Sequence, residues 1–314
     1  MSVYTPVSQT ELESHLESYE IGQLVEFEGI SAGVENTNYF VTTTKGEFVL
    51  TLVESVEECK LPFIFGLVDQ LTEQGIRCAK LIRDCQGSAF RTLNQRPAVI
   101  MQRLAGKPVS RPTHAQALTI GETLARAHLA SSTMPQEHYT HIQQWCLELG
   151  AKVQPHLASK ERDLLQTALM RSGELPWQRL PSGPIHADLF PDNAMFDGNS
   201  LTGIIDFYHA CSAPYLYDLA VTLNAWSWDE ATLQYDEQIH QNILSQYQNA
   251  RLLNSDELFY LPLMQLAAAT RFWLSRLRDL HFPADGEQIT VKNPAVKQSL
   301  VNHHLSGYGR TAAV

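Results

Sequence analysis

The chain has 314 residues, of which 44% are hydrophobic and 18% charged, with a formal net charge of −11 at pH 7. This length suffices for two lobes with a sizeable core, and the composition is that of an ordinary globular enzyme. An acidic balance without a clustered basic face argues against nucleic acid as a partner. The sequence has neither a run of about eighteen apolar residues, which a membrane span needs, nor a secretory signal at its N-terminus. We therefore expect a cytoplasmic protein that binds no membrane.

The five cysteines are scattered along the chain and form neither a Cys-x-x-Cys pair nor a metal-ligand set with histidines. Because their number is odd, the sequence predicts free thiols, buried or half-buried, without a disulfide framework. They are Cys59, Cys78, Cys85, Cys146 and Cys211.

The first hundred residues alternate short apolar runs with turn residues, which predicts a small β-rich lobe. A capped helix starts at Ser8. Small and polar residues at 31–38 separate the first two predicted strands. A plain antiparallel meander would have the same pattern, so these strands alone do not define a function. The expected strands are residues 24–30, 39–43, 47–53 and 98–106, with a helix at 61–71.

From Pro112 onward apolar residues recur at the helical spacing, so the sequence predicts a mainly helical second lobe. One strongly helical stretch, residues 263–280, carries Arg271 among large apolar residues. Asp218 is the predicted N-cap of another helix. The last three residues, 312–314, are expected to be disordered.

A loop and hairpin between residues 185 and 207 carry the polar residues that suggest a reaction. Asp188 lies five residues before Asn193, and Asp206 follows thirteen residues after Asn193. Short apolar runs with a Gly-Asn turn between them predict a hairpin, which brings its two ends together. Asp188 and Asn193 at one end would then face Asp206 at the other.

This arrangement suits phosphoryl transfer. Asp188 would accept the proton of an attacking hydroxyl, while Asn193 and Asp206 would hold Mg²⁺ on the phosphates of ATP. Magnesium prefers oxygen ligands, which Asn and Asp supply. The spacing Asp-x-x-x-x-Asn, with His186 two residues ahead, also matches the catalytic loop of kinases. His186 would pack beneath the loop and hydrogen-bond its backbone. The alternative is that all of these are ordinary turn residues.

The chain resembles the kinase-like family of small-molecule phosphotransferases, which includes aminoglycoside phosphotransferases and choline kinases. Within that family it looks most like the bacterial homoserine kinases of this fold. The motif at residues 186–193 is specific for the superfamily, and the segments at 35–40 and 271–276 narrow the choice. The resemblance implies an α+β, two-lobed protein-kinase-like fold. Its nucleotide-binding lobe, with a small antiparallel sheet, would be residues 1–103, and a mainly helical lobe with the catalytic hairpin and the acceptor-substrate site would be residues 104–314.

The same resemblance implies where the nucleotide binds. In such folds a loop after the first strand covers the phosphates with its backbone amides, which makes Gly33 and Asn36 candidates. The last strand of the lobe runs into a hinge that binds adenine, which adds Gln102 and Leu104, although any strand-to-loop transition has this pattern.

One position departs from the broad kinase pattern. The third strand of kinases carries a lysine that pairs with the phosphates, whereas this chain has Thr51. Homoserine kinases of this type are similar in lacking that lysine, so the departure does not imply an inactive enzyme. It leaves open which cation besides Mg²⁺ balances the phosphate charge.

Three functions are compatible with these residues. The first is ATP-dependent phosphorylation of L-homoserine to O-phospho-L-homoserine, on the route to threonine. The second is phosphorylation of another small alcohol, such as an aminoglycoside, choline or a sugar-like molecule. The third is nucleotide binding without catalysis, against which the complete set of Asp188, Asn193 and Asp206 argues.

The homoserine reading implies a site for a small zwitterion. We expect Arg271 to bind its carboxylate, because a planar guanidinium can donate two parallel hydrogen bonds. Tyr208 and His209, directly after the metal aspartate, would line the acceptor side. The alternative for Arg271 is that its stem covers apolar surface.

Overall fold

A computed structural model describes residues 5–30, 36–139, 141–283 and 292–311. The chain forms two compact units, whose positions relative to one another are not determined. Unit 1 comprises residues 1–107, 195–198 and 202–208, and unit 2 comprises residues 108–194, 199–201 and 209–314.

Unit 1 is built on an antiparallel sheet with the strand order β1-β2-β3-β6-β4, in which β5 also pairs with β6. The four predicted strands are present, with ends shifted by a few residues, as β1 (Leu24–Gly29), β2 (Thr37–Thr43), β3 (Gly46–Leu52) and β6 (Arg96–Gln102). The sheet also contains two short strands that the sequence did not predict, β4 (Leu81–Ile82) and β5 (Arg91–Leu93).

Among its described residues, unit 1 also contains two α-helices. Helix α1 (Gln9–Leu16) begins with the predicted capping box, in which Ser8 N donates to the Glu11 carboxylate at 2.7 Å and Ser8 Oγ accepts from Glu11 N. It shares one hydrophobic core with alternate residues of β2 and β3, which explains the period of two in those strands. Helix α2 (Leu61–Glu73) buries seven mainly aliphatic and aromatic residues and ends just before Gly75, as predicted.

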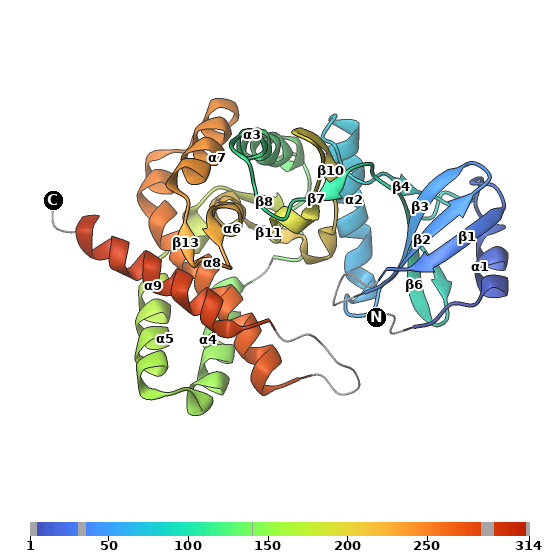
Figure 1. Ribbon diagram of the computed structural model, residues 1–314. Helices are drawn as coiled ribbons and strands as arrows, with labels where there is room; N and C mark the ends of the chain where they lie inside the picture. The colour runs from blue at the N-terminus through green and yellow to red at the C-terminus, as the bar shows by residue number, and fades with distance from the viewer. Residues whose placement is uncertain (1–4, 31–35, 140, 284–291, 312–314) are drawn as a thin grey trace. The chain divides into compact units, whose positions relative to one another are not determined.

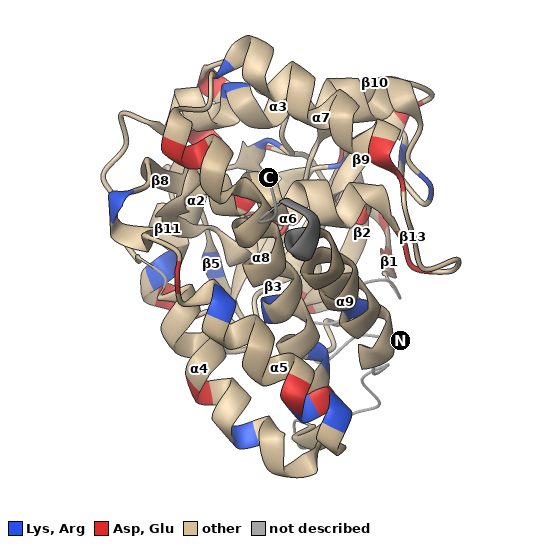
Figure 2. Ribbon diagram, turned by 90° about the vertical axis from the view of Figure 1, so that its left-hand side faces the viewer, with Lys and Arg blue, Asp and Glu red and all other residues tan. Residues whose placement is uncertain are grey.

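Unit 2 is mainly helical, as predicted, and α8 contacts α4, α5, α6 and α9 (Figure 1). Helices α4 and α5 each carry both acidic and basic residues (Figure 2). The helices are α3 (His114–Ser131), α4 (Ile142–Val153), α5 (Ser159–Ser172), α6 (Tyr215–Ser227), α7 (Glu237–Ala250), α8 (Ser255–His281) and α9 (Pro294–Thr311). Short antiparallel pairs are formed by β8 (Ser182–Ile185) with β11 (Cys211–Pro214) and by β12 (Trp228–Asp229) with β13 (Gln234–Tyr235).

The predicted start of α6 was wrong. The helix begins at Tyr215, directly after the extended residue Pro214, so Asp218 lies inside its first turn and is not the N-cap. The signal misled because an aspartate in the first helical turn is favoured for the same electrostatic reason as an aspartate cap. Asp218 is completely buried, which a cap need not be.

In the described residues, every helix is too short or too polar to cross a bilayer. The five cysteines are free, as expected, with Cys59 and Cys85 exposed and the other three buried. The expectation for residues 312–314 lies outside the described part of the chain.

Three half-buried histidines join α9 and α7 to α6 and to the β12–β13 hairpin. His304 Nε2 lies 2.8 Å from Asn224 Oδ1, and His240 Nδ1 lies 2.6 Å from the Tyr235 hydroxyl. The ring of His303 stacks on Tyr235 at 4.6 Å. Burial, with a smaller contribution from the neighbouring histidines, lowers the pKa of His240 to about 4 and that of His304 to about 3.

These two histidines make stability depend on pH. Their pKa values in the folded state lie below the ordinary value of about 6.5, so the unfolded chain binds more protons between about pH 6.5 and pH 4. Their contribution is complete above pH 6.5 and falls with acidification by up to about 1.4 kcal/mol per pH unit for each histidine. Urea unfolding at pH 7, 6 and 5 measures this slope. In a double variant, His240→Asn with His304→Gln, the free energy of unfolding should depend less steeply on pH. An unchanged slope would contradict the assignment of this pH dependence to the two histidines.

Candidate active site

The catalytic hairpin forms as predicted. Strands β9 (Ala194–Asp197) and β10 (Ser200–Ile204) are joined at Gly198, which has φ of +58°, and β9 also pairs with β7 (Lys107–Pro108). Gly106, with φ of +86°, lets the chain approach this hairpin closely. A Cβ at that position would lie 2.3 Å from the Phe196 carbonyl oxygen, so the approach requires glycine.

The loop before the hairpin brings two of the predicted residues together within unit 2. Asn193 Nδ2 donates to the Asp188 carbonyl oxygen at 2.8 Å and to Asp188 Oδ2 at 3.2 Å. Both bonds use the amide nitrogen of Asn193, so neither occupies its oxygen, which is the atom that a magnesium ion would need. His186 is buried and its Nδ1 accepts from Asp188 N at 3.2 Å, which confirms the predicted position beneath the loop.

Asp218 fixes the backbone of this loop from below. Strands β8 and β11 are antiparallel, so α6 begins beside Ser182 and its first turn carries Asp218 back to the loop. Asp218 Oδ2 accepts from His186 N at 3.0 Å, and Oδ1 accepts from Ala187 N at 2.8 Å. Ala187 has φ of +65°, a conformation that costs a non-glycine residue energy and persists only where its surroundings hold it.

A buried polar chain continues from Asp218 into α3, α7 and α8. His128 Nε2 lies 3.0 Å from Asp218 Oδ2, and His128 Nδ1 lies 2.7 Å from the Tyr247 hydroxyl. Arg251 donates to that hydroxyl at 3.2 Å and to Glu257 at 2.8 Å. Each of these hydrogen-bonded side chains has a partner, which is the condition under which a buried polar network stabilises a fold.

The protonation states of the first two members follow from their surroundings. Burial alone would raise the pKa of Asp218, but hydrogen bonds from His128 and the loop amide hold that pKa below its ordinary value. Burial lowers the pKa of His128, so its ring is neutral at pH 7. Nε2–H then donates to Asp218, and Nδ1 accepts from Tyr247.

Asp206 belongs to unit 1. It follows β10, and two backbone hydrogen bonds join Ile204, the last residue of β10, to another segment of that unit. Ile204 N donates to the Arg77 carbonyl oxygen at 2.9 Å, and Ala79 N donates to the Ile204 carbonyl oxygen at 3.1 Å. Asp206 has φ of +63°, a second left-handed non-glycine residue at the predicted site. Its distance from Asn193 stays a prediction.

The nucleotide candidates lie in unit 1, with Gly33 outside the described residues. Asn36 is buried, and its Oδ1 accepts from Glu54 N at 3.0 Å, so it joins the end of the loop to the chain after β3. Gln102 is the last residue of β6, and Leu104 lies in the segment that follows it. Their contact with a nucleotide stays a prediction.

Thr51 occupies the position at which the third strand of most kinases has a lysine. Its hydroxyl donates to Asn38 Oδ1 at 2.7 Å, which binds β3 to β2 and leaves the position uncharged. Tyr208 lies near this threonine within unit 1, and burial raises the pKa of its hydroxyl far above the ordinary value. His209 is half-buried in unit 2.

Arg271 is half-buried on α8. Its guanidinium carbon lies 5.2 Å from the centre of the Trp145 ring and 4.6 Å from that of Phe272, and Nη1 donates to Ser275 Oγ at 3.2 Å. Burial raises the pKa of Tyr217, and the charges of Arg271 and Asp188 both act on that hydroxyl. The Tyr217 hydroxyl is therefore within electrostatic range of both Arg271 and Asp188.

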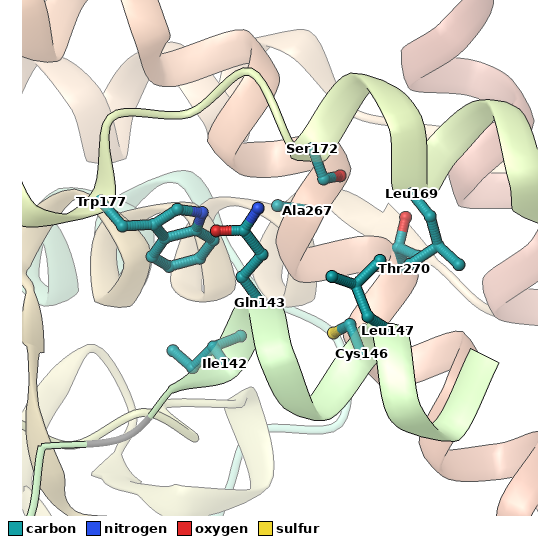
Figure 3. Close-up of a pocket in the computed structure, with 9 residues that line it drawn as sticks. All are labelled: Ile142, Gln143, Cys146, Leu147, Leu169, Ser172, Trp177, Ala267 and Thr270. Carbon is teal, nitrogen blue, oxygen red and sulfur yellow. The ribbon is translucent and has the colours of Figure 1, made fainter. Parts of the chain in front are cut away.

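A small cavity adjoins this region between α4, α5 and α8 (Figure 3). Its lining includes Cys146, which also acts on Tyr217, and Trp177, whose ring lies 6.0 Å from that of Tyr217. The cavity volume is ≈ 10 Å³, enough for about one water molecule. An acceptor substrate therefore does not fit there.

Comparison with known families matches residues 26–253 to a family described as the phosphotransferase enzyme family. The chain belongs to the phosphotransferase enzyme family. Among curated relatives, a homoserine kinase of Methylobacillus flagellatus is 38% identical over 100% of this chain and 98% of its own length. A homoserine kinase of Neisseria meningitidis serogroup B is 37% identical over 96% of this chain and 99% of its own.

Solved structures support the predicted protein-kinase-like, α+β fold of this phosphotransferase. The amicoumacin kinase hAmiN, solved in complex with AMP-PNP and Ca²⁺, has a TM-score of 0.73 at 13% identity, covering 95% of this chain and 94% of that one. The choline kinase LicA from Streptococcus pneumoniae has a TM-score of 0.65 at 12% identity, covering 96% and 98%. At these identities the likeness concerns the fold.

Sequence reasoning missed the supporting role of Asp218 and His128. Replacing Asp218 with asparagine would leave an amide where a carboxylate now accepts from two loop amides and a histidine. We expect Asp218→Asn to lower the free energy of unfolding by about 2–4 kcal/mol. We also expect a lower turnover, because the loop that carries Asp188 loses its anchor.

Urea unfolding and phosphotransfer rates measure both effects. Asp236→Asn is the matched control, because Asp236 is an exposed N-cap that accepts from Gln238 N and Ile239 N, and asparagine caps nearly as well as aspartate. Equal losses of stability in the two variants would show that the buried Asp218 contributes no more to stability than an exposed N-cap does.

Proposed function

We propose that this phosphotransferase is a homoserine kinase, which transfers the γ-phosphoryl group of ATP to the hydroxyl of L-homoserine and makes O-phospho-L-homoserine for threonine biosynthesis. The observation that carries the proposal is the similarity to curated homoserine kinases over nearly the full length of both chains. The paired Asp188 and Asn193 supply the groups that such a reaction needs.

In this mechanism Asp188 accepts the proton of the acceptor hydroxyl as the new O–P bond forms. Asn193 fixes the loop through its amide nitrogen, and its oxygen would hold Mg²⁺ together with the Asp206 carboxylate. When bound, ATP supplies the phosphoryl group and Mg²⁺ compensates the charge on its phosphates. The donor set fits this ion because an amide oxygen and a carboxylate are hard ligands.

The remaining site residues form two groups in the proposal. Gly33, Asn36, Gln102 and Leu104 bind the nucleotide in unit 1. Tyr208, His209 and Arg271 line the acceptor side. For Arg271 the support is that its charge and that of Asp188 both act on the Tyr217 hydroxyl.

Asp188→Asn tests the proton acceptor. Asparagine keeps the shape and can still contact Asn193, but it cannot take up a proton at neutral pH. We expect the turnover number to fall by about 10²–10⁴-fold, with ATP affinity changed by no more than about twofold. Steady-state kinetics and nucleotide titration give the two quantities. Asp192→Asn, an exposed position of the same loop, is the control, and near-normal turnover in Asp188→Asn would remove Asp188 from this role.

A panel of acceptors tests the substrate. With ATP and Mg²⁺ we expect the wild-type kcat/KM for L-homoserine to exceed that for choline, an aminoglycoside and a sugar alcohol by about 10²-fold or more, since a site with paired polar groups rejects molecules that leave them unpaired. Release of ADP and detection of the phosphorylated product measure this. A preference for another alcohol would favour the second reading, and ATP binding without turnover on any acceptor would favour the third.

A further inference from the structure

Three charged side chains from distant parts of unit 2 meet at the start of α9. Glu230 follows β12, Arg276 lies on α8, and Lys297 lies in the first turn of α9. We call these three residues the Glu230 cluster. Arg276 Nη2 donates to both Glu230 oxygens, at 2.7 and 3.0 Å, and Lys297 Nζ lies 2.8 Å from Glu230 Oε1.

The cluster contains more positive than negative charge. Two cations share one carboxylate, and both are buried, Lys297 being 3% and Arg276 7% exposed. The positive end of the α9 dipole lies at the same place, where Ala295 N is capped by Asn293. Burial lowers the pKa of Lys297, Glu230 raises it, and the cations Arg276 and Lys292 lower it again.

An uncompensated buried cation is costly, and an anion that joins the cluster would relieve that cost. The Glu230 side chain is 44% exposed, so the cluster can be reached from solvent on that side. Donors also remain. Lys297 has three N–H groups and Arg276 five, more than Glu230 and the Asn293 carbonyl, which accepts from Arg276 at 3.1 Å, can take up.

The cluster lies against the catalytic loop. Lys297 Nζ is 5.1 Å from the centre of the Phe190 ring, and Phe190 is two residues after Asp188. Phe272, one turn before Arg276 on α8, packs edge-on against the same ring at 4.9 Å. Through the Phe190 ring, the cluster therefore contacts the loop that carries Asp188.

We infer that the Glu230 cluster binds the zwitterionic end of an amino-acid acceptor, with Arg276 and Lys297 on its carboxylate and the exposed face of Glu230 on its ammonium group. The inference rests on the proposed function, to which it adds the basis of substrate choice. Charge-assisted hydrogen bonds of both signs within one cluster match an α-amino acid and no simple alcohol.

The sequence pointed to Arg271 for the carboxylate. In the structure its guanidinium lies over two aromatic rings and donates to Ser275, an arrangement in which it covers apolar surface. Arg276, five residues later on the same helix, has the second cation and the carboxylate beside it. Arg271 and Arg276 are therefore alternative candidates for binding the carboxylate of the substrate.

Three acceptors separate the two charges of the substrate. L-Homoserine carries both, 4-hydroxybutanoate lacks the ammonium group, and 3-aminopropan-1-ol lacks the carboxylate. The kcat/KM for each would be measured with wild type, Lys297→Met and Glu230→Gln. Lys160→Met, at an exposed lysine of α5, is the matched control for loss of a lysine, and Arg271→Lys tests the rival. Thermal unfolding of each variant reports whether it is folded.

Lys297→Met should lower kcat/KM by about tenfold or more for homoserine and 4-hydroxybutanoate, with a change within about twofold for 3-aminopropan-1-ol. Glu230→Gln, which keeps the shape of the side chain and one oxygen that accepts hydrogen bonds, should lower it for homoserine and 3-aminopropan-1-ol but not for 4-hydroxybutanoate. KM for ATP should stay within about twofold in both, and Lys160→Met should match wild type.

Equal losses on all three acceptors would show that the cluster supports the fold only, and a loss of carboxylate selectivity in Arg271→Lys alone would assign the role to Arg271. Either result overturns the inference while homoserine kinase activity stands. If Lys297→Met does not fold, the selectivity of Glu230→Gln decides alone. Absence of homoserine phosphorylation by wild type would instead overturn the proposed function.

Discussion

A single buried carboxylate, that of Asp218, holds the catalytic loop in shape. Two successive amides of the loop, from His186 and Ala187, donate to it, and the second belongs to a residue with a left-handed backbone. Such a conformation is retained only when stronger interactions impose it. The relative position of Asp188 and Asn193 therefore depends on a residue that takes no part in the chemistry. Full burial makes this dependence stronger, because the two amides and His128 stabilise the carboxylate in place of solvent.

The elements around Asp218 are arranged to keep it ionised and immobile. The antiparallel pair of β8 and β11 determines where α6 starts, and α3 supplies His128 from the opposite side. Through Tyr247, Arg251 and Glu257 the same hydrogen-bonded chain reaches the cap of α8, the helix that also carries Arg276. Helix α8 thus connects the support of the loop with the charged groups beside it. Helices therefore support the loop of unit 2 that carries Asp188 and Asn193.

Much of this architecture could be predicted from the sequence because it is encoded locally. The alternation of β2 and β3, the capping box at Ser8 and the hairpin after Asn193 each follow from residues within a few positions of one another. The role of Asp218 could not be read in this way, since an aspartate in the first turn of a helix has the same local signature whether it caps the helix or holds a loop. The Glu230 cluster was beyond reach for a related reason. Its members are 46 and 21 residues apart, counted from 230 to 276 and from 276 to 297, and no periodic pattern connects them. A histidine on an apolar helix face, His128, carried a weak signal, because burial of such a side chain requires a polar partner.

The close approach of α3 and α7 has a mechanical consequence for the loop. At Gly121 a Cβ would lie 2.3 Å from the Ile243 carbonyl oxygen, so the two helices touch through their backbones at that point. Because backbone meets backbone there, a side chain at position 121 would force the two helices apart. Tyr247 is one turn beyond Ile243, and His128 is two turns beyond Gly121. The glycine therefore allows the close helix separation at which His128 and Tyr247 form their hydrogen bond. Through it, a change of one methyl group on an outer helix would reach the backbone that carries Asp188.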